Sequence, residues 1–195
     1  MKKLLLVFVP ILFLLLIWMV FFWSPEKNHS VLSSAQQPMG GEFTLESATG
    51  KIALKDFRNK IVLIYFGYTW CPDICPTNLA MMSAAFTQLN EQEAQQVQGL
   101  FISVDPDRDS VKRLSSYTEF FHKKIMGLTG SKKQINELSK RYGVSYRLVK
   151  QDSATDYVVD HSSETYVVGK QGQLLEKIPH ASPPEQILLT IRKYL

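Results

Sequence analysis

Cysteine is scarce in this sequence of 195 residues, because Cys71 and Cys75 are the only two. A disulfide that serves purely as a structural staple usually closes a long loop, since the entropy it removes from the unfolded chain grows with loop length. A spacing of four residues closes a very short loop. The pair is therefore predicted to have a chemical function.

Three further absences exclude other classes of protein. The chain has no CxxCH motif, which excludes covalent attachment of a c-type haem. It has no basic patch with interleaved aromatic residues, so no nucleic-acid partner is expected. It also has no internal repeat and no low-complexity tract. Without Lys2 and Lys3, 20 basic residues face 18 acidic ones, so the remainder of the chain is nearly neutral.

Residues 1–23 are predicted to form an N-terminal transmembrane anchor. An uncharged apolar run extends from Leu4 to Trp23, and its 20 residues would reach about 30 Å as a helix, enough to span a bilayer. A cleavable signal peptide is the alternative, but its apolar region is typically about 7 to 15 residues long and ends near a small-residue cleavage site. Here the nearest such site, at residues 33–35, lies well beyond the run. Lys2 and Lys3 predict a cytoplasmic N-terminus with the rest of the chain outside.

Residues 24–41 are predicted to be a flexible tether, and residues 42–195 a single globular domain. The tether is polar and contains Pro25, Pro38 and a pair of glycines. His29 and Met39 lie within it and are interpreted as linker residues. The domain is long enough to bury a core of its own.

The cysteines lie at a predicted junction between a strand and a helix. Residues 61–66 are continuously apolar, which is typical of a strand buried on both faces. Apolar residues then recur at helical spacing, namely Leu79, Met82, Phe86 and Leu89. A helix beginning near Pro76 would place Cys75 at the N-cap and Cys71 in the preceding turn. The unpaired amides and the dipole of that helix would stabilise a thiolate, which is both a redox nucleophile and a soft-metal ligand.

The order of the predicted elements indicates an α/β domain. A β-hairpin turns at residues 48–50, a second buried strand covers residues 100–104, and helices are expected over residues 111–121 and 131–143. Strands at residues 144–149, 157–159, 165–168 and 174–178 then precede a last helix capped at Ser182. We predict a thioredoxin-like fold, with an N-terminal hairpin and helices flanking a mixed central sheet. Ligand sites in such sheets lie at the carboxyl ends of the strands, where the cysteines fall.

The four histidines differ in their surroundings. His29 lies in the tether, and His122 and His180 are predicted to be exposed or half-buried polar residues. His161 lies in the polar segment 160–164 between two apolar runs, which we interpret as a tight turn. Only the fold could bring it to the cysteines, 86 residues earlier, and its spacing alone leaves its role open.

Two acidic residues and two methionines lie close to the cysteines or to His161 in the sequence. Asp73 and Asp160 could orient His161 or meet a partner, or they could be solvated loop acids. Met82 belongs to the apolar stripe of the predicted helix, and Met81 needs no role beyond packing.

Three segments resemble the Sco (SenC) family of membrane-anchored copper chaperones. They are residues 68–76, which contain CxxxCP, residues 104–109, and residues 159–162, which contain DHS. The resemblance implies that Cys71, Cys75 and His161 bind one copper ion. It also implies a thioredoxin-like fold and a role in assembling the binuclear copper centre of cytochrome c oxidase subunit II. Trp70 stands where phenylalanine is commoner in that family.

The proposed ligand set is chemically consistent with copper. Two thiolates and an imidazole suit Cu(I) and can also hold Cu(II), whereas structural zinc normally takes four protein ligands and three are present here. An ordinary thioredoxin has two residues between its cysteines and a cis-proline opposite them. Here three residues separate the cysteines, and no proline lies between Pro106 and Pro179.

A second function stays open. A thiol-disulfide oxidoreductase that keeps the oxidase copper-site cysteines reduced would use the same two cysteines. A chaperone with no enzymatic activity is the preferred interpretation. The expected location is an inner membrane, with the domain in the periplasm or, in a eukaryote, in the mitochondrial intermembrane space.

Overall fold

The computed structural model describes Trp18, residues 40–150 and residues 157–195. The chain divides into two units, residues 1–36 and 37–195, and all the elements below belong to the second. Apart from Trp18, Gly40 and Gly41, the predicted anchor and tether lie outside the described residues, as do His29 and Met39. Within the part described, no helix combines the length and apolar character needed to cross a membrane.

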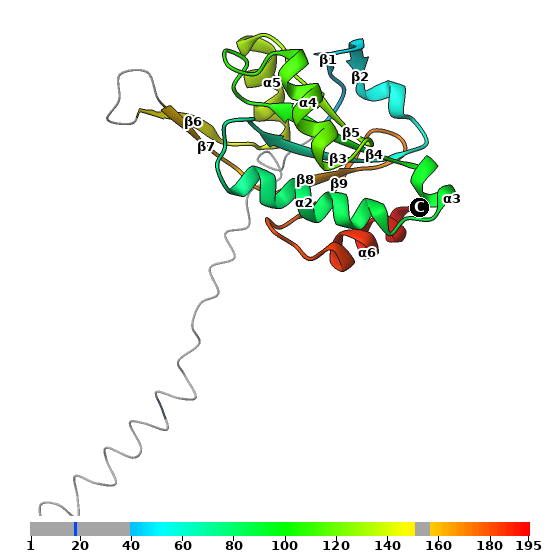
Figure 1. The fold of residues 1–195 in the computed structure, drawn as a ribbon. Coiled ribbons are helices and arrows are strands. Elements are labelled where there is room, and N and C mark those ends of the chain that lie inside the picture. The colour runs from blue at the N-terminus through cyan, green and yellow to red at the C-terminus, as the bar shows by residue number, and fades with distance from the viewer. Residues whose placement is uncertain (1–17, 19–39, 151–156) are drawn as a thin grey trace, which may run out of the picture. The chain divides into compact units, whose positions relative to one another are not determined.

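A mixed sheet of five strands forms the centre of the domain, in the order β5-β4-β3-β8-β9 (Figure 1). Strands β3, β4 and β5 are parallel, whereas β8 is antiparallel to both β3 and β9. The strand bounds are β3 Ile61–Gly67, β4 Val97–Ser103, β5 Ile125–Leu128, β8 Thr165–Val168 and β9 Leu174–Ile178. Every residue of β3 is buried, which confirms the predicted central strand.

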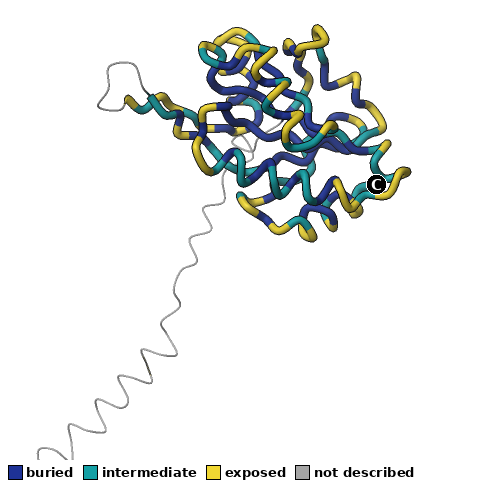
Figure 2. Tube along the Cα trace, in the orientation of Figure 1, coloured by how far each residue is buried: buried dark blue, intermediate teal, exposed yellow. Residues whose placement is uncertain are grey.

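Helices cover both faces of this sheet. They are α2 Ile74–Thr87, α3 Glu91–Gln95, α4 Val111–Phe121, α5 Lys132–Tyr142 and α6 Pro184–Tyr194. On one face Phe101 of β4 contacts Tyr117 of α4, with 5.5 Å between ring centroids, and α2 lies beside α6 on this same side. On the other face Phe66 of β3 packs against Tyr142 of α5 at 5.7 Å. The sheet is thus a buried layer between helices, as the dark interior in Figure 2 shows.

Two antiparallel hairpins and a 3-10 helix complete the domain. The first hairpin, β1 Thr44–Ser47 and β2 Gly50–Ala53, confirms the predicted N-terminal hairpin, and the 3-10 helix η2 Leu54–Phe57 follows it. The second hairpin is formed by β6 Tyr146–Lys150 and β7 Tyr157–His161, and it extends away from the sheet (Figure 1). These elements establish the predicted thioredoxin-like α/β architecture.

The start of α2 differs from the prediction. Asp73 is the N-cap, so Cys75 lies inside the first turn instead of at the cap. The amide of Thr77 donates to the carbonyl of Asp73 at 3.1 Å, which begins the helix before Pro76. Proline is tolerated there because amides of the first turn have no partner within the helix. The predicted Ser182 cap of α6 is also wrong, since the Ser182 hydroxyl donates to the Pro179 carbonyl and Pro183 is the N-cap.

His161 is the last residue of β7 and does not lie in a turn. It is paired with Tyr146 of β6, and the amide of Ser162 continues the pairing by donating to the carbonyl of Ser145 at 2.9 Å. The strand therefore extends into the polar DHS segment, because backbone pairing with β6 does not require apolar side chains.

Candidate metal centre

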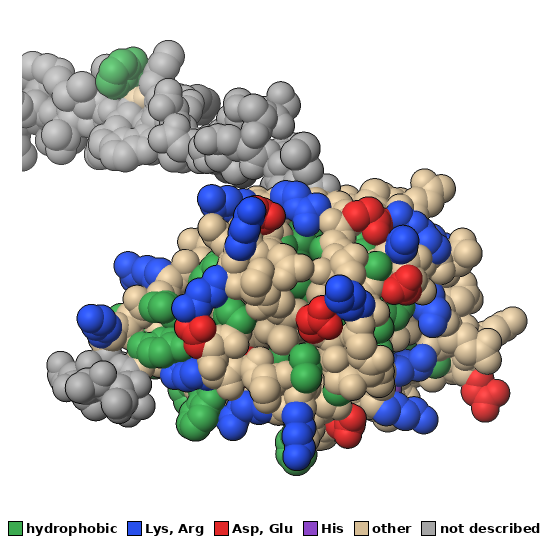
Figure 3. Space-filling view, turned by 90° about the horizontal axis from the view of Figure 1, so that it is seen from above, with side chains coloured by type: hydrophobic (Ala, Val, Ile, Leu, Met, Phe, Trp, Pro, Cys, Tyr) green, Lys and Arg blue, Asp and Glu red, His purple; other side chains and the backbone are tan. Residues whose placement is uncertain are grey.

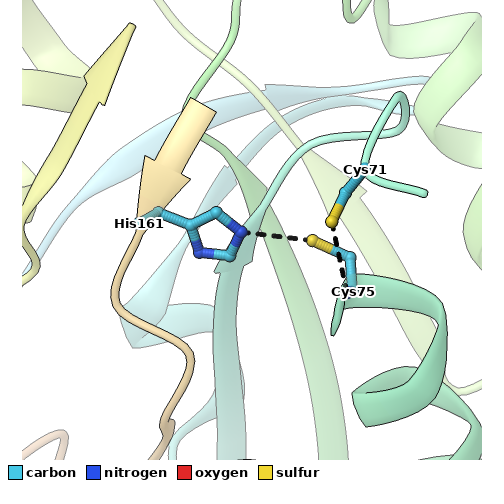
Figure 4. Close-up of side chains that lie close together, drawn as sticks. All are labelled: Cys71, Cys75 and His161. Atoms are coloured by element: carbon cyan, nitrogen blue, oxygen red, sulfur yellow. Dashed lines mark hydrogen bonds between the residues drawn. The ribbon is translucent and has the colours of Figure 1, made fainter. Parts of the chain in front are cut away.

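Three elements bring the predicted ligands together (Figure 4). Cys71 lies in the turn that follows β3, Cys75 in the first turn of α2, and His161 at the end of β7. Their donor atoms all lie within 4.8 Å of one another. The Sγ atom of Cys75 is 3.3 Å from Nε2 of His161, and the amide of Cys75 donates to Sγ of Cys71 at 3.5 Å. This is the group that the sequence predicted.

The group lies just beneath the surface. Cys71 and His161 are each 8% exposed, whereas Cys75 is completely buried. Both cysteines are free thiols. Burial of this depth removes both cysteines from most water, and of the two only Cys71 keeps any exposure.

A backbone hydrogen bond fixes the orientation of the His161 ring. Nδ1 lies 2.8 Å from the carbonyl oxygen of Ser162, and a carbonyl can only accept, so Nδ1 carries the proton. In the neutral ring Nε2 is then the unprotonated nitrogen, and it faces Cys75. The rings of Tyr65 and Tyr68 contact the imidazole edge-on, at centroid distances of 6.1 and 5.9 Å. His161 is thus held in the tautomer that a metal ligand needs.

The two thiols have opposite acidities. A hydrogen bond from Cys75 lowers the pKa of Cys71 to about 3, assisted by the backbone amides of Asp73 and Cys75, although burial opposes the shift. Burial raises the pKa of Cys75, and the adjacent Cys71 raises it further. The first proton to leave the pair therefore comes from Cys71, which gives one thiolate that is hydrogen-bonded to one thiol.

A buried carboxylate holds the loop that carries Cys71. Asp109 is fully buried and accepts hydrogen bonds from the amide of Thr69 at 3.0 Å, from its hydroxyl at 2.6 Å, and from the hydroxyl of Ser103 at 2.7 Å. Arg113 donates to the same Thr69 hydroxyl at 2.5 Å. Sequence reasoning assigned Asp109 no role, although it ends one of the three family-like segments.

A second cluster joins the loop after β4 to the strand that carries His161. The hydroxyl of Tyr157 donates to Asp105 at 2.6 Å, and Arg108 donates to the Tyr157 carbonyl at 3.0 Å. Arg108 also forms an ion pair with Asp105 and lies 3.6 Å from the centre of the Tyr157 ring. The first residue of β7 is therefore fixed to the loop after β4, four residues before the histidine.

The two acidic residues Asp73 and Asp160 lie outside the group. Asp160 pairs with Arg147 at the surface, and Asp73 accepts a long hydrogen bond from the Thr77 hydroxyl; neither carboxylate bonds to the His161 ring within the described residues.

Among the described residues, His122 and His180 are not members of this group. His122 accepts the Lys124 amide at 3.0 Å, and His180 lies after β9. Met82 belongs to the core, against which Met81 packs, as predicted.

The surface carries no patch of a single charge on the face shown in Figure 3. Basic and acidic side chains alternate there, with small apolar areas between them. Trp70, next to Cys71, is 54% exposed, and Arg113 lies 4.3 Å from the centre of its ring.

A thioredoxin-like domain that gathers two free cysteines and a histidine where its central strand meets a helix belongs to the class of thioredoxin-fold proteins with a thiol and soft-metal site. The donor set of that site can hold a copper ion. Comparison with known proteins narrows this class. The family described as SCO1/SenC matches residues 32–195, and the chain belongs to that family.

Individual relatives agree with this assignment. The mitochondrial SCO2 homolog of Bos taurus is 40% identical over 157 residues, which are 80% of this chain and 59% of the relative. The chain thus spans about three fifths of the length of that relative. Bradyrhizobium japonicum ScoI, solved with copper bound, is 32% identical with a TM-score of 0.74, and the match covers 80% of this chain and 99% of that one.

A more distant structure, that of BsSco, is described with a redox property. BsSco is described as a member of the Sco family of cytochrome c oxidase assembly proteins in which a disulfide switch was identified. It is 25% identical with a TM-score of 0.63, and the match covers 81% of this chain and 94% of that one.

Proposed function

We propose that this chain is a copper chaperone that holds one copper ion with Cys71, Cys75 and His161 and delivers it to the binuclear copper site of cytochrome c oxidase subunit II. The observation that carries the proposal is the convergence of three soft or borderline donor atoms within 4.8 Å. No fourth His, Cys, Asp or Glu joins this group among the described residues. Three protein ligands leave a position open to a ligand from the acceptor, which suits a protein that must release its metal.

The electrostatics of the site suit Cu(I). Two thiolates, a neutral imidazole and Cu(I) give a net charge near minus one, whereas Cu(II) gives a site near neutrality. The first turn of α2 offsets the negative charge, because the amide of Cys75 already donates to the Cys71 sulfur. Copper binding requires both thiols to lose their protons. Cys71 has already lost its proton near neutral pH, so only the proton of Cys75 remains to be displaced.

Thiol-disulfide exchange is the second candidate function, and the acidity of Cys71 favours it. A thiolate beside a neutral thiol at a helix N-terminus is the arrangement of a redox-active pair. This function needs only the cysteines, whereas copper transfer needs His161 as well. Copper loading requires the reduced form in either case.

Substitutions in cells that lack the native protein separate the two functions. We expect His161→Ala to retain the fold and to form the Cys71–Cys75 disulfide, but to lose bound copper and to abolish oxidase assembly. Cys71→Ser and Cys75→Ser should lose both activities, because each chemistry uses both sulfur atoms. Full oxidase activity with His161→Ala, together with none in the cysteine variants, would establish the thiol reductase and refute copper transfer.

We further propose the domain organisation and location that the sequence predicts. Residues 1–23 form a single-pass anchor, residues 24–41 a tether, and residues 42–195 the copper-binding domain. The domain lies outside the bacterial inner membrane or on the equivalent side of a mitochondrial membrane. The apolar run after Lys2 and Lys3 supports this placement.

A further inference from the structure

A buried tyrosine hydroxyl near the sulfur atoms lacks a hydrogen-bond partner. Tyr65 lies on β3 and is completely buried. Its hydroxyl forms no hydrogen bond within the described part of the chain, although it lies against the side chain of Cys75. Burying an unpaired hydroxyl costs free energy, so a phenylalanine would serve better if packing were the only role.

The packing around Tyr65 directs its ring to the site. The ring contacts Phe101 and His161, each with 6.1 Å between centroids. Two residues further along β3, on the same face of the sheet, Gly67 leaves room for the Cys75 sulfur: a Cβ atom at that position would lie 2.8 Å from it. The sulfur of Cys75 therefore rests against this face, with the phenol ring beside it.

The charge of the sulfur decides whether this hydroxyl finds a partner. A neutral thiol is a weak acceptor, whereas a thiolate, free or bound to a metal, is a strong one. The structure holds the unpaired Tyr65 hydroxyl beside the Cys75 side chain, where it can become a donor to that sulfur. When copper binds, the Cys75 sulfur becomes anionic beside a donor that is already in place.

We propose that Tyr65 is a positioning residue whose hydroxyl donates a hydrogen bond to the Cys75 sulfur when that sulfur carries negative charge, and so favours the copper-bound and reduced states over the disulfide. The copper part of this inference rests on the proposed function. The redox part does not, because the hydrogen bond between the two sulfur atoms spreads the thiolate charge of the reduced pair from Cys71 onto Cys75, and the disulfide carries no such charge.

The chain offers a matched control in Tyr166. It is also completely buried and its hydroxyl is also unpaired, but it lies on the opposite face of the sheet, where its ring contacts Phe66 and Tyr142. Replacing either tyrosine with phenylalanine removes one oxygen atom and keeps the ring. Thermal unfolding of the metal-free variants should show both as stable as the unsubstituted protein, or slightly more so.

The first test uses copper. Competition with a Cu(I) chelator should show retention weakened about tenfold in Tyr65→Phe and unchanged in Tyr166→Phe, as expected for a lost hydrogen bond to a charged group. The sulfur-to-Cu(II) charge-transfer band should move to lower energy in Tyr65→Phe alone, because an unbonded thiolate is a stronger donor. Equal affinity and an equal band position in both variants would overturn the proposal and leave the copper function standing.

The second test needs no metal. Two molecules of glutathione reduce the Cys71–Cys75 disulfide to the dithiol and form one glutathione disulfide, so the equilibrium constant can be measured for each variant. We expect Tyr65→Phe to shift it several-fold toward the protein disulfide and Tyr166→Phe to leave it unchanged. If the unsubstituted protein binds no copper, the proposed function fails and this equilibrium alone decides the role of Tyr65. An unchanged constant in Tyr65→Phe would then refute it.

Discussion

The Nε2 atom of His161 lies 3.3 Å from the Sγ atom of Cys75, although 86 residues separate the two. The histidine reaches this position because β7 pairs with β6 and because Tyr157, at the start of β7, is bound to Asp105 and Arg108. Nε2 carries no proton, so the proton between the two atoms is that of the Cys75 thiol, and a metal ion would take its place. The site is therefore assembled by the fold of the whole domain and is ready to exchange a proton for a metal ion.

The acidity of Cys71 predicts how the reduced protein responds to pH. Its pKa in the folded chain is about 3, below its ordinary value of 9.0, so its ionisation stabilises the fold fully above pH 9. That stabilisation is lost progressively as the pH falls toward 3. We expect the ultraviolet absorption of one thiolate per chain to persist at pH 6 in the reduced, metal-free protein.

Two cysteine variants check the cause of this acidity. Cys71→Ser should lose the thiolate band. Cys75→Ala should move its titration to higher pH, because the hydrogen bond from Cys75 is the largest cause of the shift. A wild-type titration near the ordinary thiol pKa would contradict this assignment.

Asp109 should be essential for the loop that carries Cys71. In Asp109→Asn the amide group cannot accept all three hydrogen bonds, so at least one buried donor loses its partner. We expect the free energy of unfolding in urea to fall by about 1 to 3 kcal/mol. Asp107→Asn is the control, because Asp107 is half exposed and pairs with Lys132 at the surface. It should change stability by less than about 0.5 kcal/mol, and equal losses in the two variants would argue against the role of Asp109.

The proposed topology is tested with reporters fused after Leu195. An enzyme that is active only outside the cytoplasm should be active in the fusion, whereas a reporter that works only in the cytoplasm should be silent. The protein should fractionate with membranes and keep Met1 or Lys2 at its N-terminus. Cytoplasmic reporter activity would overturn the topology, and a mature N-terminus near Gln36 would overturn the anchor.

Much of the fold could be predicted because its strands and helices carry their own local signals. The apolar run of β3 and the helix α4 were found with nearly correct bounds. The capping box at Ser131 and the left-handed Gly143 correctly delimited α5. In each case the deciding interactions lie within a few residues, so the sequence alone contains them.

The remaining features depend on long-range contacts. Asp109 bonds to Thr69 across 40 residues, and no local pattern marks an aspartate in a polar loop as buried. His161 was placed in a turn because its neighbours are polar, whereas pairing with Tyr146 makes it part of a strand. The unpaired hydroxyl of Tyr65 is likewise invisible in the sequence, since it depends on how α2 packs against β3.

The most direct test of the copper site is X-ray absorption at the copper edge, measured on the full chain purified in detergent with reductant and loaded with Cu(I). We predict about one copper per chain, bound by two sulfur atoms and one imidazole nitrogen, with the nitrogen contribution lost in His161→Ala. A spectrum of the unsubstituted protein with sulfur ligands only, or a protein that binds stoichiometric zinc and no copper, would contradict the assignment of Cys71, Cys75 and His161 as a copper site.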